Sequence, residues 1–126
     1  MPIAPGTRLG PYEILAVLGV GGMGEVYKAR DTRLDRLVAV KTMRADLAES
    51  VEARERFERE ARAISKLSHP HICALFDVGY AGGTEYLVME LLDGETLAHR
   101  IAKGPLPMAN VLAAGVEIAG ALAEAH

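Results

Sequence analysis

The sequence predicts a protein of the α+β class, with five antiparallel strands and one helix first and further helices after them. Short extended segments separated by glycine or polar turns occupy much of residues 12–91, apart from one stretch with helical spacing. From Thr96 onward the pattern is helical throughout. The length of 126 residues is that of one domain or of part of one.

The first three strands are expected to form a meander. Residues 12–18 are a short apolar segment, a glycine-rich turn follows, and residues 25–30 resume the extended pattern. Residues 31–35 are polar and turn-like, and the apolar run 37–40 predicts a third strand that ends at Lys41 or Met43. Residues 1–11 contain three prolines and two glycines, which predicts an irregular lead-in.

A helix is predicted between Ser50 and Lys66. Its apolar residues recur at intervals of four, three and three and therefore share one face: Phe57, Ala61, Ile64 and Leu67. Pro70 ends this pattern. Residues 73–78 and 85–91 then predict two more strands, separated by a turn at residues 79–84.

Two helices are predicted in the last third of the chain. The first covers residues 96–102 and is interrupted by Gly104 and Pro105, and the second covers residues 107–126. Apolar residues surround most of the second helix, a pattern typical of burial on nearly all sides. Because this chain offers too little to bury it, we expect more protein around it, from a continuation of the chain or from a partner.

Composition excludes several classes of function. With 14 basic and 17 acidic residues the net charge is -3, which disfavours nucleic acid as a partner. The hydrophobic fraction of 50% excludes wholesale disorder. The chain has neither a secretory start nor about 18 uninterrupted apolar residues, so no membrane segment and a cytoplasmic location are expected. His69, His71 and Cys73 lack the ligand spacing of a zinc site, and no metal site is predicted.

Four glycines between residues 19 and 24 predict a loop whose backbone comes close to a ligand, with N–H groups that can meet phosphate oxygens. The P-loop of nucleoside triphosphatases is excluded because Glu25 stands where that motif needs lysine. A dinucleotide fold is disfavoured because no helix has room to follow the glycines. A flexible hairpin tip is the structural alternative to a phosphate loop.

Lys41 and Glu60 are the second candidate feature. Lys41 ends a strand that should be mostly buried, so its ammonium group needs an anion. Glu60 falls on the apolar side of the predicted helix and would provide a carboxylate. The alternatives are that Lys41 extends its ammonium group into water and that Glu60 pairs with Arg56, four residues earlier.

Taken in order, these segments resemble the opening of a bacterial-type serine/threonine protein kinase. The resemblance extends over residues 12–126, and its motifs are the glycine loop, Val38-Ala39-Val40-Lys41, Arg59-Glu60-Ala61, His69-Pro70-His71-Ile72, and Tyr86-Leu87-Val88-Met89-Glu90 followed by Asp93-Gly94. It implies a kinase-like N-lobe over residues 12–90, a hinge over 90–95 and the first helices of the C-lobe over 96–126.

The resemblance also implies site residues. Lys41, paired with Glu60, would hold the α and β phosphates of ATP under the loop Gly19-Val20-Gly21-Gly22-Met23-Gly24. Leu18, Val26 and Ala39 would enclose the adenine, and Met89 would be the gatekeeper. Backbone groups of Glu90 and Leu92 would bond the adenine edge, and Glu95 would reach the ribose.

The chain contains no His-Arg-Asp and no Asp-Phe-Gly segment. In this family those segments provide the catalytic base and the Mg²⁺ ligands, so Mg²⁺ is expected only in a complete kinase and this chain alone is expected to be inactive. A complete kinase would phosphorylate serine or threonine in protein substrates, and self-association through the kinase lobes is a further possible partnership. The alternative is a nucleotide-binding or interaction module without catalysis.

Overall fold

The structure is a computed structural model that describes residues 3–21, 24–43 and 50–126. The chain forms two compact units. Met1–Lys66 and Ala74–Leu91 make up the first, which we call the sheet unit, and Leu67–Cys73 and Leu92–His126 make up the second, which we call the helical unit. Residues 67–73, just after the first long helix, thus belong with the last third of the chain.

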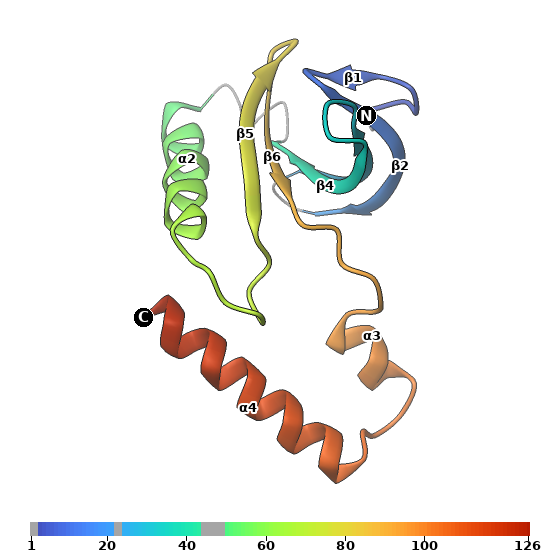
Figure 1. Cartoon of the computed structure of the whole chain (residues 1–126), viewed down its shortest axis with the longest axis vertical. Helices are drawn as coiled ribbons and strands as arrows, with labels where there is room; N and C mark the ends of the chain where they lie inside the picture. Colours follow the sequence, from blue (N-terminus) through green and yellow to red (C-terminus); the bar gives the residue numbers. More distant parts are fainter. Residues whose placement is uncertain (1–2, 22–23, 44–49) are drawn as a thin grey trace. The chain divides into compact units, whose positions relative to one another are not determined.

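Within the described residues, the sheet unit is a curled antiparallel sheet with one helix, which confirms the predicted fold class (Figure 1). Its strands follow the order β1-β2-β3-β4-β6-β5. The elements are β1 (Arg8–Leu9), β2 (Tyr12–Val20), β3 (Glu25–Asp31), β4 (Arg36–Thr42), α2 (Val51–Ser65), β5 (Leu75–Ala81) and β6 (Thr84–Met89). All neighbouring strands pair antiparallel.

The sheet has six strands rather than the five predicted, because the segment predicted to be irregular contributes β1. Gly10 adopts a positive φ of 57°, which lets the chain reverse so that Leu9 pairs with Tyr12. Leu9 is buried. A strand of two residues is too short to produce an alternating pattern, so no sequence pattern indicates it.

The turn between β5 and β6 is shorter than predicted. β5 continues to Ala81, and the reversal takes place at Gly82 and Gly83, whose φ angles are 57° and 78°. Gly79, which the sequence assigned to the turn, is inside the strand opposite Tyr86. A side chain at Gly79 would overlap the Tyr86 ring, so glycine is required here by packing.

Two apolar clusters lie on opposite faces of the sheet. The larger gathers residues from β1, β2, β3, β4 and β6: Leu9, Tyr12, Ile14, Tyr27, Ala29, Val38, Val40, Tyr86 and Val88. The smaller joins α2 to the sheet through Met43, Phe57, Ala61 and Leu87. Ser50 caps α2 by accepting a hydrogen bond from the Ala53 N–H at 3.2 Å.

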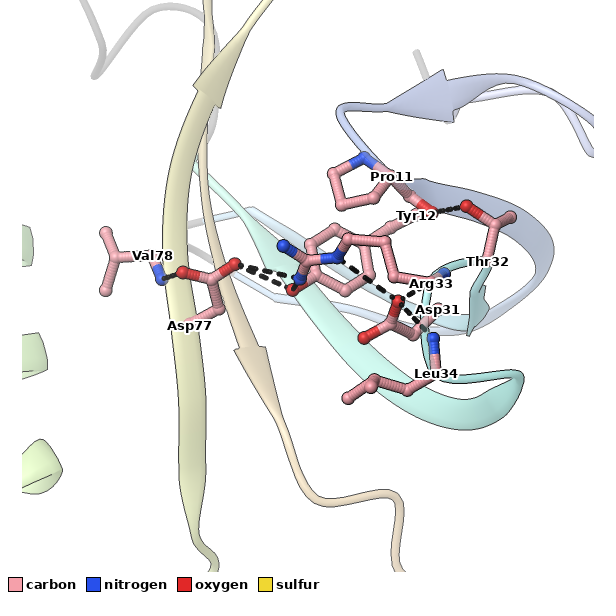
Figure 2. Close-up of polar contacts among 8 residues, drawn as sticks. All are labelled: Pro11, Tyr12, Asp31, Thr32, Arg33, Leu34, Asp77 and Val78. Carbon is pink, nitrogen blue, oxygen red and sulfur yellow. Dashed lines mark hydrogen bonds and ion pairs between the residues drawn. The ribbon is translucent and has the colours of Figure 1, made fainter.

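A polar network connects β2, the turn after β3, and the edge strand β5 (Figure 2). The Tyr12 hydroxyl donates to Asp77 Oδ2 at 2.7 Å and accepts from Arg33 NH2 at 2.9 Å. Tyr12 also contacts the Tyr86 ring edge-to-face, at 5.9 Å between centroids. Since β2 and β5 are not neighbours in the sheet, these contacts stabilise its curl.

Asp31 organises the turn between β3 and β4. Its carboxylate is buried and accepts hydrogen bonds from the backbone N–H groups of Arg33 at 2.9 Å and Leu34 at 3.3 Å. Burial by itself raises the pKa of Asp31, but the two N–H groups and the Arg33 guanidinium outweigh burial and lower the pKa below its usual value. The charged carboxylate is therefore the form that the fold stabilises.

The helical unit contains both predicted helices, α3 (Leu97–Ala102) and α4 (Met108–Ala125). Thr96 caps α3 by accepting from the His99 N–H at 3.0 Å. No residue of α4 is buried, in agreement with the expectation that this chain offers too little to cover it.

An apolar groove of about 490 Å³ lies between α4 and residues 67–72. Within the described residues, α4 is also the one helix long and apolar enough to cross a membrane, with a mean hydropathy of 1.3. Core helices of soluble domains have the same length and composition.

Gly79→Ala is expected to lower the free energy of unfolding by about 1 to 3 kcal/mol, because the added methyl group meets the buried Tyr86 ring. Urea denaturation measures the change. Gly115→Ala is the control: no atom lies within 4 Å of its added carbon and the residue is inside α4, so a small gain in stability is expected. Equal effects of the two substitutions would contradict the packing role of Gly79.

Asp31→Asn is expected to cost about 1 to 2 kcal/mol at neutral pH, because the charged acceptor is lost. A carboxyl with a lowered folded-state pKa contributes stability above its unfolded pKa of about 3.9 and loses it as pH falls through the folded value. The difference from the unsubstituted protein should therefore shrink below about pH 4. Thermal melts from pH 2 to 7 measure it. Exposed Asp35→Asn should show a much smaller pH-dependent difference.

Candidate nucleotide site on the sheet

The pairing of β4 with its two neighbours fixes the face on which Lys41 lies. Lys41 is directly opposite Val26 of β3 and Leu87 of β6. Residues directly opposite each other in antiparallel strands point to the same face. Val26, Lys41 and Leu87 therefore form one row across this face of the sheet.

A second row lies two residues along the strands. Ala39 is opposite Lys28 of β3 and Met89 of β6, and Met89 in turn is opposite Leu75 of β5. Because side chains alternate along a strand, this row shares the face of Lys41. The register thus brings four of the predicted site residues to one face: Val26, Ala39, Lys41 and Met89.

The helix α2 covers the same face. Phe57 and Ala61 pack with Leu87 and with Met43, which follows Lys41 by two residues and so alternates to the same side. Lys41 itself is partly buried. Lys41 thus lies on the face of the sheet that α2 covers.

Glu60 and Lys41 form no ion pair within 4.0 Å in the described part of the chain, and Glu60 is exposed. Phe57 and Ala61 mark the line of α2 that faces the sheet. One residue of an α-helix turns by about 100°, so Glu60 points to the side of this line. Nor does Glu60 pair with Arg56. The carboxylate-first pair that does form on α2 joins Glu58 to Arg62 at 3.7 Å.

The glycine-rich turn joins β2 to β3 next to this face. Gly19 is opposite Val26, and a carbon added at Gly19 would meet no atom within 4 Å. The Gly21 N–H donates to the Gly24 carbonyl at 2.8 Å and closes the turn. Leu18 and Val20 are exposed. Two predicted residues, Gly22 and Met23, lie outside the described residues.

The predicted hinge residues belong to different units: Glu90 is in the sheet unit, and Leu92 and Glu95 are in the helical unit. The Glu90 N–H donates to the Ala74 carbonyl at 2.9 Å, so this N–H is not the group that would donate to a ligand. Leu92 belongs to the helical unit and is exposed. The Glu95 carboxylate, in the same unit, contacts three basic side chains: His99, Arg100 and Lys103.

Sequence reasoning missed Leu75 and Leu87, which the register places in the two rows with Ala39 and Lys41. The alternation of β6 could have identified Leu87, because it is two residues before Met89. Leu75 was harder to identify, since a bulge between Leu75 and Asp77 shifts the register of β5. Across the described residues, no group of three or more His, Cys, Asp or Glu could hold a metal.

A curled antiparallel sheet with a glycine-rich turn, a lysine on an inner strand and one helix on the same face defines the protein-kinase-like class of fold. The chain belongs to the protein kinase domain family, whose pattern it matches over residues 12–126.

Similar proteins are bacterial serine/threonine kinases. PrkC of Bacillus subtilis is 45% identical over 123 residues, which cover 96% of this chain and 19% of PrkC. PknD of Mycobacterium tuberculosis is 40% identical over 122 residues, covering 96% of this chain and 18% of PknD. A crystal structure of the Mycobacterium tuberculosis PknI kinase domain superposes with a TM-score of 0.84 at 33% identity, covering 100% of this chain and 53% of that one. The chain thus spans about a fifth of these curated relatives and about half of a solved kinase domain.

Glu60→Gln is expected to change the free energy of unfolding by less than about 0.5 kcal/mol, because the exposed carboxylate has no ion-pair partner among the residues that the structure describes. Phe57→Ala on the same helix should cost about 3 to 5 kcal/mol, since Phe57 is buried against the sheet. Urea denaturation without nucleotide measures both. A large cost for Glu60→Gln would show that the carboxylate supports the fold.

Proposed function

We propose that the chain is the ATP-binding part of a serine/threonine protein kinase that transfers the γ-phosphoryl group of ATP to serine or threonine hydroxyls of proteins. The observation that carries the proposal is the position of Lys41, opposite Val26 and Leu87 on the face covered by α2. A lysine on an apolar, half-covered face needs an anion, and ATP phosphates provide one.

Different residues near this face would bind different parts of ATP. The apolar side chains of Leu18, Val26 and Ala39 would enclose the adenine, with Met89 as gatekeeper. The turn of residues 19–24 and Lys41 would hold the phosphates, since backbone N–H groups and an ammonium group both complement phosphate oxygens. Backbone groups of Glu90 and Leu92 would meet the adenine edge. Mg²⁺, when bound with ATP, neutralises charge on the phosphates.

The proposed pair of Lys41 and Glu60 requires a movement. Lys41 lies on the face that α2 covers, but Glu60 points to the side of the contact line of Phe57 and Ala61. A rotation or shift of α2 would turn the Glu60 carboxylate toward the ammonium group. We assign the pair to the nucleotide-bound state, in which Lys41 must be held in place between the carboxylate and the phosphates.

Phosphoryl transfer requires residues that this sequence lacks. It contains no His-Arg-Asp and no Asp-Phe-Gly segment, and phosphoryl transfer depends on the base and metal ligands that these segments provide. We therefore propose that the chain binds ATP and does not transfer phosphate by itself. A cytoplasmic location, where ATP is available, accords with this proposal.

Lys41→Met is expected to weaken ATP binding to the full-length protein at least tenfold and to abolish its phosphorylation of a serine/threonine protein substrate. Isothermal titration calorimetry and transfer of ³²P from γ-labelled ATP measure the two effects. Lys66→Met is the matched control, because Lys66 ends α2 on an exposed surface away from the Lys41 face. Undiminished phosphorylation by Lys41→Met protein would overturn the assigned role.

A further inference from the structure

Thr42 and Asp31 are the two buried polar side chains among the described residues, and Thr42 is 2% exposed. Asp31 organises the turn in which it lies, whereas Thr42 is at the end of β4. It follows Lys41, so its side chain points to the opposite face of the sheet. A buried hydroxyl group needs a hydrogen-bond partner, and that partner shows what Thr42 holds in place.

The partner of the Thr42 hydroxyl is Glu25, the first residue of β3. Thr42 Oγ1 is 3.3 Å from Glu25 Oε2 and 3.4 Å from the Glu25 main-chain oxygen. These are long hydrogen bonds, and one hydroxyl proton serves one acceptor at a time. Both acceptors belong to the same residue, so either bond ties the start of β3 to the end of β4. The pairing of the two strands ends with Val26 opposite Lys41, and this contact extends it by one residue.

Glu25 carries this connection to the glycine-rich turn. It shares a planar peptide unit with Gly24, so a fixed Glu25 fixes the direction of the Gly24 carbonyl. That carbonyl accepts a hydrogen bond from the Gly21 N–H at 2.8 Å. Gly24 is buried, whereas Gly21 is exposed. A continuous path of contacts thus leads from the buried Thr42 hydroxyl through Glu25 to the exposed part of the turn.

We propose that Thr42 is a positioning residue for the phosphates of ATP: through Glu25, its hydroxyl group holds the glycine-rich turn in the conformation that meets them. This inference rests on the proposed function, which brings ATP phosphates to the turn. A loop that is ordered before its ligand arrives loses less conformational entropy on binding. Thr42 contributes this order from the face opposite to Lys41, so it acts without touching the nucleotide.

The inference makes Thr42 important for the phosphates and not for adenosine. In the proposed function, side chains of the sheet enclose the adenine, and only the phosphates meet both the turn and Lys41. Loss of the Thr42 hydroxyl should therefore weaken the binding of ATP and leave the binding of adenosine unchanged. General damage to the sheet unit would weaken the binding of both ligands. The ratio of the two dissociation constants thus separates positioning from stability.

The test measures the dissociation constants of ATP and adenosine for the full-length protein with Mg²⁺, by isothermal titration calorimetry. Thr42→Val removes the hydroxyl group, keeps the shape and suits a strand. It should reduce the preference for ATP about two- to tenfold, the effect of one hydrogen bond. Thr42→Ser keeps a hydroxyl group and should keep the preference. Thr84→Val is the matched control, because the Thr84 hydroxyl at the start of β6 has no hydrogen bond among the described residues, and it should leave the preference unchanged.

A double substitution tests the path through Glu25. The carboxylate is absent from Glu25→Ala protein, so Thr42→Val should reduce the ATP preference less there than in the unsubstituted protein. Equal reductions in the two backgrounds would show that Thr42 acts through another group, such as its neighbour Lys41, and would overturn the inference.

The outcomes separate this inference from the proposed function. If Thr42→Val weakens both ligands alike or leaves the preference unchanged, or if Thr42→Ser or Thr84→Val reduces the preference as much, the positioning role is wrong while nucleotide binding stands. If the unsubstituted protein binds neither ligand, or binds adenosine as tightly as ATP, the proposed function itself is wrong. A preference that Thr42→Val reduces and the other two single variants preserve supports the inference.

Discussion

The register of β4 between β3 and β6 is the constraint on which the candidate site depends. Side chains alternate along a strand, so a shift of one residue would turn Lys41 to the opposite face, against Tyr27 and Val88, and would turn Val38 and Val40 away from it. An ammonium group enclosed there would lose its hydration without gaining an anion. The apolar residues of β4 in the larger cluster, Val38 and Val40, thus determine the register of the strand. The register in turn determines the face of the sheet on which Lys41 lies.

The curl of the sheet depends on contacts that no local pattern shows. Tyr12 and Asp77 are 65 residues apart, yet the tyrosine hydroxyl donates to the carboxylate at 2.7 Å (Figure 2). The sequence pattern places Tyr12 in the apolar segment 12–18 and Asp77 in the strand 73–78, and it indicates no contact between them. Their pairing requires the sheet to bring non-neighbouring strands together, and a single sequence contains no measure of such curvature.

Local signals predicted most of the elements and fewer of their contacts. Glycine and polar turns predicted the separation of β2, β3 and β4, and the caps Thr96 and Pro107 begin α3 and α4 where the pattern places them. Gly79 was misread because glycine has two uses, in turns and beneath a large ring, and only the position of Tyr86 decides between them. β1 was missed because two residues cannot show a period.

The spacing on α2 identified the buried pair Phe57 and Ala61 and overestimated the width of the buried face. The pattern extended this face to Ile64, which is 36% exposed, and to Glu60, which is exposed. Glu60 is about 100° around the helix from Ala61 and points to the side of the sheet, whereas Ile64 shares the direction of Phe57 but lies in the last turn of α2. Helical spacing therefore shows which way a helix faces, but the partner surface decides how many of its residues become buried.

In α4 too, the partner surface decides burial: the sequence pattern predicts a buried helix that this chain offers too little to cover. Its apolar residues surround the helix, yet none is buried here. A surface helix in water would show a polar face, and a membrane span would show the same apolar surface as a core helix. This chain covers 53% of the solved PknI kinase domain, so that domain has residues with no counterpart in this chain. A helix with this surface is stable in water only where other apolar surface covers it, which is the requirement that its sequence pattern expresses.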